Sequence, residues 1–297
     1  MYLFKRYVSL IYLAIAIIFL LAGIFFLIFR FDTVRKMVDL ADDNSARIPI
    51  LMYHHFADDK KNPSVVISAE MFESHIKALC DAGYTTISFE ELCAFVFDNA
   101  ELPERPIIIT SDDGYTSVYD TAFPILKKYG VKATVFVIGI LHGQTLYKDT
   151  AYPVFPLHFG DDEGRIMAQS GILSIQSHSY DMHQVESYET PPFRIGVLPM
   201  DGESEDEYIA AFKADFERSA EQIENITGIR PFVFSYPYGR STDLSEKLLS
   251  DYGVKVTLTI KKGPNYVKRN SPDSLFGLKR YNVPGNMTAA ELLSMIR

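Results

Sequence analysis

Residues 106–115 of the chain read PIIITSDDGY. An apolar, strand-forming run leads directly into two adjacent carboxylates, Asp112 and Asp113, and then into Gly114. Each carboxylate would have a lower free energy in open water than at the end of a buried strand. A divalent cation makes adjacent carboxylates tolerable there, and Gly114 permits the sharp turn that follows. The alternative is an ordinary turn, because Asp and Gly are common turn residues.

Apolar, β-rich runs alternate with helical patterns along residues 48–297. The candidate strands are Ile48–Tyr53, Tyr84–Ser88, Pro106–Ser111, Ala133–Ile138, Leu173–Ser177, Pro231–Tyr236, Lys255–Ile260 and Leu278–Val283. Several of these runs are continuously apolar, which is typical of a parallel sheet covered by helices. The alternation predicts an α/β fold, either a barrel or a doubly wound sheet.

Apolar residues at three- and four-residue spacing predict helices between these strands. The clearest helical patterns cover residues 69–83, 116–130 and 205–228, and the last of them ends on a glycine stop signal. Residues 184–205 show no clear periodicity, and we interpret them as a functional rim rather than a linker.

An uncharged apolar segment, VSLIYLAIAIIFLLAGIFFLIF, lies near the N-terminus at residues 8–29. As a helix it would extend about 33 Å, enough to cross a bilayer. A core helix would show a polar stripe, and a signal peptide would have a shorter apolar region with a small-residue cleavage site. The sequence therefore predicts a short cytoplasmic tail (1–7), an uncleaved transmembrane anchor (8–29), a charged juxtamembrane stalk (30–47) and one folded domain (48–297).

Composition limits the other possibilities. The net charge of −9 argues against a nucleic-acid partner, because neutralising phosphates requires clustered Lys and Arg. Cys80 and Cys93 are the two cysteines. They are interpreted as small apolar residues, and a disulfide is the alternative if the domain is exported.

Polar residues follow four of the candidate strands where each strand ends. They are His54-His55, Asp112-Asp113-Gly114, His178-Ser179-Tyr180-Asp181-Met182-His183 and Pro237-Tyr238-Gly239. In α/β folds, sites gather where the carboxyl ends of strands meet the following loops. Two histidines and one carboxylate form a familiar hydrolytic zinc shell, and a second carboxylate is then free to act as a general base. The remaining histidines, His75, His142 and His158, are interpreted as structural or exposed.

These motifs resemble those of the metal-dependent polysaccharide deacetylases, carbohydrate esterase family four. Thr110–Gly114 is similar to the family's Thr-Phe-Asp-Asp-Gly motif, with Ser111 in place of the aromatic residue. His178–His183 is similar to its histidine motif and is one residue longer than the common His-x3-His form. Ser235–Tyr238 resembles the Arg-x-Pro-Tyr motif without its arginine, and no histidine follows His183 to supply the family's late general acid.

The departures resemble the subgroup that deacetylates poly-N-acetylglucosamine in biofilm matrices, in which the motif order is circularly permuted. There an early Tyr-His segment supplies the acid, and Leu51–His55 matches it. Phe232–Gly239 and Leu278–Val283 also look like that subgroup, so the resemblance covers about residues 48–297. It implies a distorted (β/α) barrel of about seven parallel strands, preceded here by the predicted transmembrane helix.

The resemblance also implies a metal site. Asp113, His178 and His183 would hold a divalent metal, with zinc the first choice, and Asp112 would be the general base. His54 would protonate the leaving amine, although a one-residue shift would exchange it with His55.

Two further roles come from the same resemblance. The backbone amide of Tyr238 would help to stabilise the tetrahedral oxyanion. Arg280, arriving from the last strand, would replace the missing motif arginine and favour the ionised base. The alternative is that Arg280 is a surface charge.

The implied protein is a single-pass membrane hydrolase with its catalytic domain outside the cytoplasm, where polymeric substrates lie. It would remove N-acetyl groups from an N-acetylhexosamine polysaccharide, either poly-N-acetylglucosamine-like or a cell-wall glycan, and release acetate. Two alternatives stay open: an O-acetyl esterase using the same metal site, and a non-catalytic glycan-binding protein on the same barrel. The 18 tyrosines could offer stacking faces for sugar rings in either case.

Overall fold

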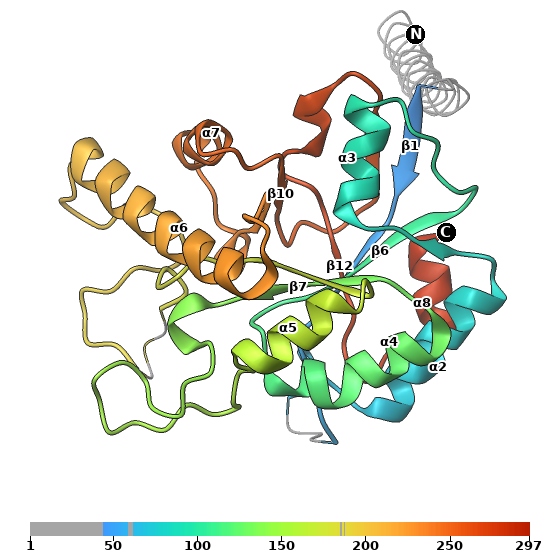
Figure 1. Ribbon diagram of the computed structural model, residues 1–297, viewed down its shortest axis with the longest axis horizontal. Coiled ribbons are helices and arrows are strands. Elements are labelled where there is room, and N and C mark those ends of the chain that lie inside the picture. Colours follow the sequence, from blue (N-terminus) through green and yellow to red (C-terminus); the bar gives the residue numbers. More distant parts are fainter. Residues whose placement is uncertain (1–43, 59–61, 185, 187) are drawn as a thin grey trace, which may run out of the picture. The chain divides into compact units, whose positions relative to one another are not determined.

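The computed structural model describes residues 44–58, 62–184, 186 and 188–297 (Figure 1). The chain divides into two compact units, Met1–Ala46 and Arg47–Arg297, and the fold below is that of the second. The predicted tail, transmembrane anchor and most of the stalk lie outside the described residues. Within the described part of the chain, no helix has the length and apolar character needed to span a bilayer.

A parallel sheet forms the centre of this unit, with strand order β10-β9-β8-β7-β6-β2-β12 and with β5 paired to β6. Its strands are β2 (Ile50–Tyr53), β5 (Thr85–Thr86), β6 (Pro106–Ser111), β7 (Ala133–Val137), β8 (Leu173–Ser177), β9 (Val233–Ser235), β10 (Val256–Leu258) and β12 (Tyr281–Asn282). Four further strands in the described residues lie outside it: β1 (Ser45–Ile48), β3 (His55–Phe56), β4 (Val66–Ile67) and β11 (Asn265–Lys268). Each predicted strand contains one strand of the sheet, which confirms the α/β prediction.

Residues 278–282, here called the closing segment, connect the two ends of the strand order. The backbone of Leu278 accepts a hydrogen bond from Thr259 and donates one to Thr257, each at 2.8 Å, at the end of β10. The following residues, Tyr281 and Asn282, pair with β2. The sheet therefore fits the predicted distorted barrel better than an open, doubly wound sheet.

Seven α-helices accompany the strands in the described residues: α2 (Ala69–Asp81), α3 (Phe89–Phe97), α4 (Phe123–Tyr129), α5 (Asp161–Gln169), α6 (Glu205–Thr227), α7 (Asp243–Asp251) and α8 (Ala289–Ile296). Single turns of 3-10 helix occupy Gly139–Leu141, Pro237–Gly239 and Pro272–Leu275. The prediction of one regular helix over 116–130 is wrong in its first half, where Val118–Ala122 is π-helical. Pro124, in the first turn of α4, has no N–H to donate, so a regular α-helix cannot continue through it.

Sequence signals at both ends of helix α6 explain where the helix begins and where it ends. The Ser204 side chain accepts a hydrogen bond from the Glu207 backbone, and the Glu207 carboxylate accepts one from Ser204, which together form a capping box. The helix ends at Gly228, whose φ of 76° is the left-handed conformation that glycine adopts without strain.

The two faces of strand β6 carry different side chains: one face contributes to the apolar core and the other to the candidate site. Ile107 and Ile109 belong to the buried apolar cluster that lies between the sheet and the helices. Thr110 and Asp112 point the other way, because successive side chains of a strand alternate between its faces. The barrel interior is therefore polar at the carboxyl ends of the strands.

The two cysteines do not form a disulfide. Cys80 is exposed, Cys93 is buried, and both are free, so the disulfide alternative is wrong.

Replacing Phe212 tests the second apolar cluster, which α6 and α7 form with β9. Phe212 is 1% exposed and packs edge-on against Phe234. Phe212→Ala should lower the free energy of unfolding by about 3–5 kcal/mol, because it removes a buried ring and leaves a cavity. Urea denaturation measures the change. The matched control is Lys213→Ala at the next, exposed position of the helix, which should change stability by less than about 0.5 kcal/mol. Equal effects would contradict the assigned packing.

Candidate active site

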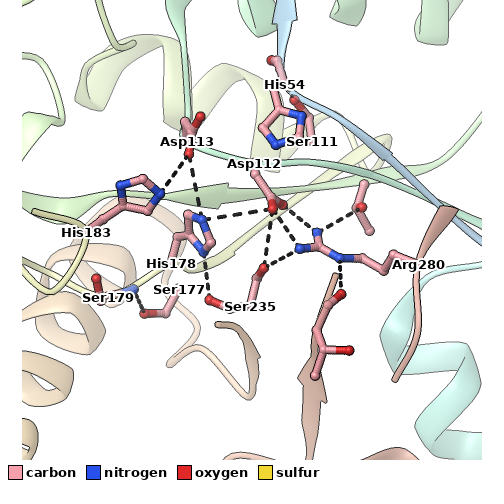
Figure 2. Close-up of polar contacts among 12 residues, drawn as sticks. His54, Ser111, Asp112, Asp113, Ser177, His178, Ser179, His183, Ser235 and Arg280 are labelled. Carbon is pink, nitrogen blue, oxygen red and sulfur yellow. Dashed lines mark hydrogen bonds and ion pairs between the residues drawn. The ribbon is translucent and has the colours of Figure 1, made fainter. Parts of the chain in front are cut away.

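The predicted site residues gather at the carboxyl ends of the strands (Figure 2). Asp112 and Asp113 follow β6, and His178 follows β8. Backbone conformations with positive φ occur at three non-glycine residues here: Asp113 (73°), Ser179 (72°) and Tyr238 (57°). Such conformations cost free energy and cluster at functional sites, where they re-aim side chains.

Asp113, His178 and His183 form a group whose ligand atoms all lie within 4.8 Å of one another. The Asp113 Oδ1 atom lies 3.7 Å from the Nε2 atom of each histidine. Ligands about 2.0–2.2 Å from a tetrahedral zinc ion would be separated by about 3.3–3.6 Å, so this spacing suits such an ion. Nδ1 of His178 donates to the Ser235 carbonyl at 2.7 Å, which leaves its Nε2 free to bind metal. The residues present therefore fit a divalent metal.

Protonation states also suit metal binding. Burial lowers the pKa of His178 to about 4, more than the neighbouring aspartates raise it, so this imidazole is neutral near pH 7. Burial raises the pKa of Asp113, but the charges of His183, His54 and His178 outweigh it and hold the pKa below its usual value. Metal ligands must be deprotonated, and both of these residues are so at neutral pH.

Asp112 has a different partner from its neighbour. Arg280, on the closing segment, donates from Nη1 to Asp112 Oδ1 at 2.6 Å and from Nη2 to Oδ2 at 2.7 Å. Burial raises the pKa of Asp112, but the charge of Arg280, together with that of His178, overrides burial and holds the pKa well below its usual range. Arg280 is fully buried, so the alternative of a surface charge is wrong.

His54 lies beside the two aspartates (Figure 2). Its charge lowers the pKa of both Asp112 and Asp113, and its buried Nδ1 atom has no hydrogen-bond partner among the described residues. The next residue, His55, is engaged elsewhere: its Nδ1 bonds to the Ser117 hydroxyl at 2.8 Å. His54 rather than His55 therefore joins this group, and its role as proton donor stays a prediction.

Tyr238 packs its side chain against His183, one of the predicted metal ligands. Its ring packs on His183 with centroids 4.3 Å apart, and its hydroxyl donates to the Gln184 carbonyl at 2.9 Å. Burial is the main cause that raises the pKa of Tyr238 to about 12, so the phenol is protonated. The role of its backbone amide stays a prediction.

Tyr115 belongs to the site, although the sequence analysis did not single it out. The Asp113 charge, burial and a hydrogen bond to Asp113 raise the pKa of Tyr115, in that order, so the phenol stays protonated and donates to this carboxylate. The sequence signal that could have identified Tyr115 is its position two residues after Asp113, at the end of the stretch 106–115.

Asp215 is a second residue of the site that the sequence did not predict. From α6, its Oδ1 and Oδ2 atoms accept the backbone N–H groups of Tyr180 (2.9 Å) and Asp181 (2.6 Å). Both amides lie in the loop between His178 and His183, the loop that is one residue longer than the common form. Asp215 therefore fixes the spacing of two potential metal ligands. Its position in a long helix gives no sequence signal, because the contact exists only in the folded chain.

Arg280→Met tests the buried pair. It leaves an uncompensated buried carboxylate and should lower the free energy of unfolding by about 3–5 kcal/mol near pH 7. The folded-state pKa of Asp112 lies below the unfolded value of about 3.9. The pair's contribution is therefore complete above that pH and is lost as the pH falls further. Urea denaturation at a series of pH values should show the deficit shrinking only in acid.

The matched control for that measurement is Arg230→Met. Arg230 forms a 2.7 Å pair with Glu217 in which both side chains are about two-fifths exposed (39% and 44%). An exposed pair contributes less than about 1 kcal/mol, so this variant should remain close to wild type. A similar loss in both variants would refute the special position of Arg280.

Asp215→Asn tests the clamp on the histidine loop. The amide can accept only one of the two backbone hydrogen bonds and turns its own donors toward the other, so the ligand spacing should relax. Zinc affinity, measured by calorimetric titration, should fall about 10–100-fold. Glu217→Gln, two residues along the same helix, is the control and should bind zinc as wild type does. Unchanged affinity of the Asp215 variant would show that the loop does not depend on this clamp.

Comparison with known proteins agrees with this geometry. A family model described as polysaccharide deacetylase matches residues 99–257. YxkH of Bacillus subtilis (strain 168), named for the same family, is 29% identical over 248 residues, covering 84% of this chain and 75% of that protein. A poly-beta-1,6-N-acetyl-D-glucosamine N-deacetylase of Staphylococcus aureus (strain MRSA252) is 22% identical over 212 residues, covering 70% of this chain and 66% of that protein.

A solved structure shares the fold. The de-N-acetylase from Aggregatibacter actinomycetemcomitans aligns with a TM-score of 0.71 and 24% identity, covering 84% of this chain and 100% of that chain. The family model matches more than half of the present chain. The resemblance drawn from the sequence is therefore confirmed: the chain belongs to the polysaccharide deacetylase family and is a hydrolase of that family.

Proposed function

We propose that this protein hydrolyses N-acetyl groups of an N-acetylhexosamine polysaccharide, releasing acetate and leaving a free amine on the polymer. One observation carries the proposal: a three-ligand group stands beside a second carboxylate, Asp112, that Arg280 keeps ionised. A relative named for poly-beta-1,6-N-acetyl-D-glucosamine supports the substrate class, poly-N-acetylglucosamine-like or a related cell-wall glycan.

The residues divide the reaction between them. Asp113, His178 and His183 would hold a divalent ion, which would acidify a water nucleophile and polarise the acyl oxygen. Asp112 accepts the proton that the water loses as it attacks the amide carbon. His54 donates a proton to the leaving nitrogen as the C–N bond breaks, so acetate and an amine result. The Tyr238 backbone amide donates to the developing oxyanion.

Zinc is the divalent ion that we propose. Two histidines and one aspartate, with a remaining position for water, are a common catalytic zinc arrangement. The same ligands also accept other divalent ions, because affinity depends on geometry and availability as well as on ligand type. Metal content after purification, before and after chelation, identifies the native ion.

We also propose that the catalytic domain lies outside the cytoplasm, held to the membrane by the predicted anchor at residues 8–29. The support is chemical: polysaccharides of this class lie outside the cell, and an enzyme must reach them. Protease treatment of intact cells should digest the domain, and complete protection of the domain in intact cells would refute this placement.

Asp112→Asn and His178→Ala separate the two halves of the proposal. Acetate release from N-acetylglucosamine oligomers should fall about 10²–10⁴-fold in Asp112→Asn, which loses the base while metal content is retained. His178→Ala should lose both metal and activity. Asp162→Asn is the control, because its side chain is 90% exposed at the start of α5.

Three results would count against the function. The first is folded, zinc-loaded wild-type protein that releases no acetate from any N-acetylated oligomer. The second is full activity in Asp112→Asn. The third is release from O-acetylated but not N-acetylated sugars, which would identify an esterase instead.

A further inference from the structure

The long loop between β7 and α5 has a rigid base. Its residues 145–159, here called the rim loop, lie beside the loop that follows β8 (Figure 1). The Tyr147 ring stacks on Tyr188 at 4.7 Å, and Lys148 forms ion pairs with Asp181 (2.8 Å) and Glu189. The rim loop is thus tied to the loop that carries His183.

The rim loop also joins the catalytic turn directly. Thr116 donates a backbone hydrogen bond to Leu157 at 2.8 Å, and Phe159 donates one to Gly114 at 3.1 Å. These bonds flank an antiparallel bridge between Tyr115 and His158. The inner end of the rim loop therefore runs alongside the turn that begins at Asp113.

The outer part of the rim loop exposes large apolar side chains. Phe155 is 83% exposed, Tyr152 is 58% exposed and Leu157 is 47% exposed. Exposed apolar side chains are normally scattered singly over a surface, whereas these three follow one another closely along one loop, here called the exposed cluster, which marks a candidate interaction site. Their backbone is held in place: Val154 and Tyr147 are buried, Val154 donates a backbone bond to Thr145, and Tyr147 donates one to Tyr152.

His158 lies between this exposed cluster and the catalytic turn. It is 8% exposed, and neither ring nitrogen has a hydrogen-bond partner among the described residues. Its ring packs on Tyr115 at 4.8 Å, and Tyr115 in turn bonds to Asp113. The prediction that His158 is merely structural or exposed is therefore incomplete: it is buried with unused hydrogen-bonding capacity near the site.

We propose that Tyr152, Phe155 and Leu157 form a subsite for a sugar residue of the polymer next to the one being deacetylated. His158 would bond to a hydroxyl or acetamido group at its inner end. The inference rests on the proposed function and deepens it. A β-linked hexosamine ring presents a face of C–H bonds that packs well on an aromatic ring, while its edge carries polar groups.

Two observations favour this occupant over a lipid surface. Residues 151–159, AYPVFPLHF, contain no charged side chain in a chain of net charge −9. An acetylated glycan is neutral and matches this segment, whereas a peripheral membrane site normally adds Lys or Arg for anionic headgroups. The cluster is also continuous with the catalytic turn through the bonds at Gly114 and Thr116, as a second sugar site on one polymer requires.

The double variant Tyr152→Ser/Phe155→Ser tests the subsite in the full chain. Wild type and variant are compared on the monosaccharide N-acetylglucosamine and on its hexamer, with metal content measured for both proteins. For the hexamer, kcat/KM should fall about tenfold through KM, because the stacking contacts are lost. The monosaccharide, which cannot occupy both places at once, should react within about twofold of wild type. His158→Gln should show the same dependence on length.

The control is Ile229→Ser, which removes an apolar side chain that is 61% exposed outside the rim loop and should leave both substrates unaffected. Equal losses on monosaccharide and hexamer, or no loss on either, would overturn the subsite.

The subsite can also be tested if the proposed function is wrong, because binding is measured separately from acetate release. If wild type releases no acetate from any oligomer, calorimetric binding of the hexamer decides the subsite alone. Weaker binding by the double variant than by wild type and Ile229→Ser upholds it. Equal binding, or none to any of the three proteins, overturns it.

Discussion

The structure depends on one buried ion pair, the two-point contact between Arg280 and Asp112. Burying both charges is costly unless the remaining donors find partners. Here Nε of Arg280 donates to the Thr259 carbonyl at 3.0 Å, and Nη2 donates to the Ser235 hydroxyl at 2.9 Å. Nη1 lies within 3.4 Å of the Thr110 hydroxyl. The guanidinium thus ties β6, β9, the end of β10 and the closing segment together at a single point.

This ion pair gives the two adjacent carboxylates different surroundings. Asp112 is neutralised by a fixed cation that belongs to the protein, so it stays ionised without a metal. Asp113 turns away, through its left-handed backbone, toward His178 and His183. Two aspartates that would repel each other in isolation are therefore compensated from opposite sides. In the proposed function, the side-chain partners of each aspartate, rather than the shared motif, decide which one would act as ligand and which as base.

Much of this arrangement could be predicted from sequence. Strand ends in a parallel sheet meet at one edge, so His54, the two aspartates and the histidine motif had to converge if the strands were right. Arg280 was placed only through the resemblance, because 168 residues separate it from its partner. Asp215, Tyr115 and the unpartnered His158 were missed as site residues, since their roles arise from contacts between loops and helices that no local pattern encodes. The π-helical turn before Pro124 was missed because apolar spacing does not report hydrogen-bond register.

The closing segment has a consequence for how the molecule is made. During synthesis, Arg280 is added 168 residues after its partner Asp112. Contacts between residues so far apart in sequence form slowly, because a long loop must close first. Until then the carboxylate lacks its counter-ion, and the interior of the half-made barrel must stay wet. A nascent chain therefore cannot assemble a dry, charge-balanced interior before the closing segment arrives, so the site is completed only after that segment has been made.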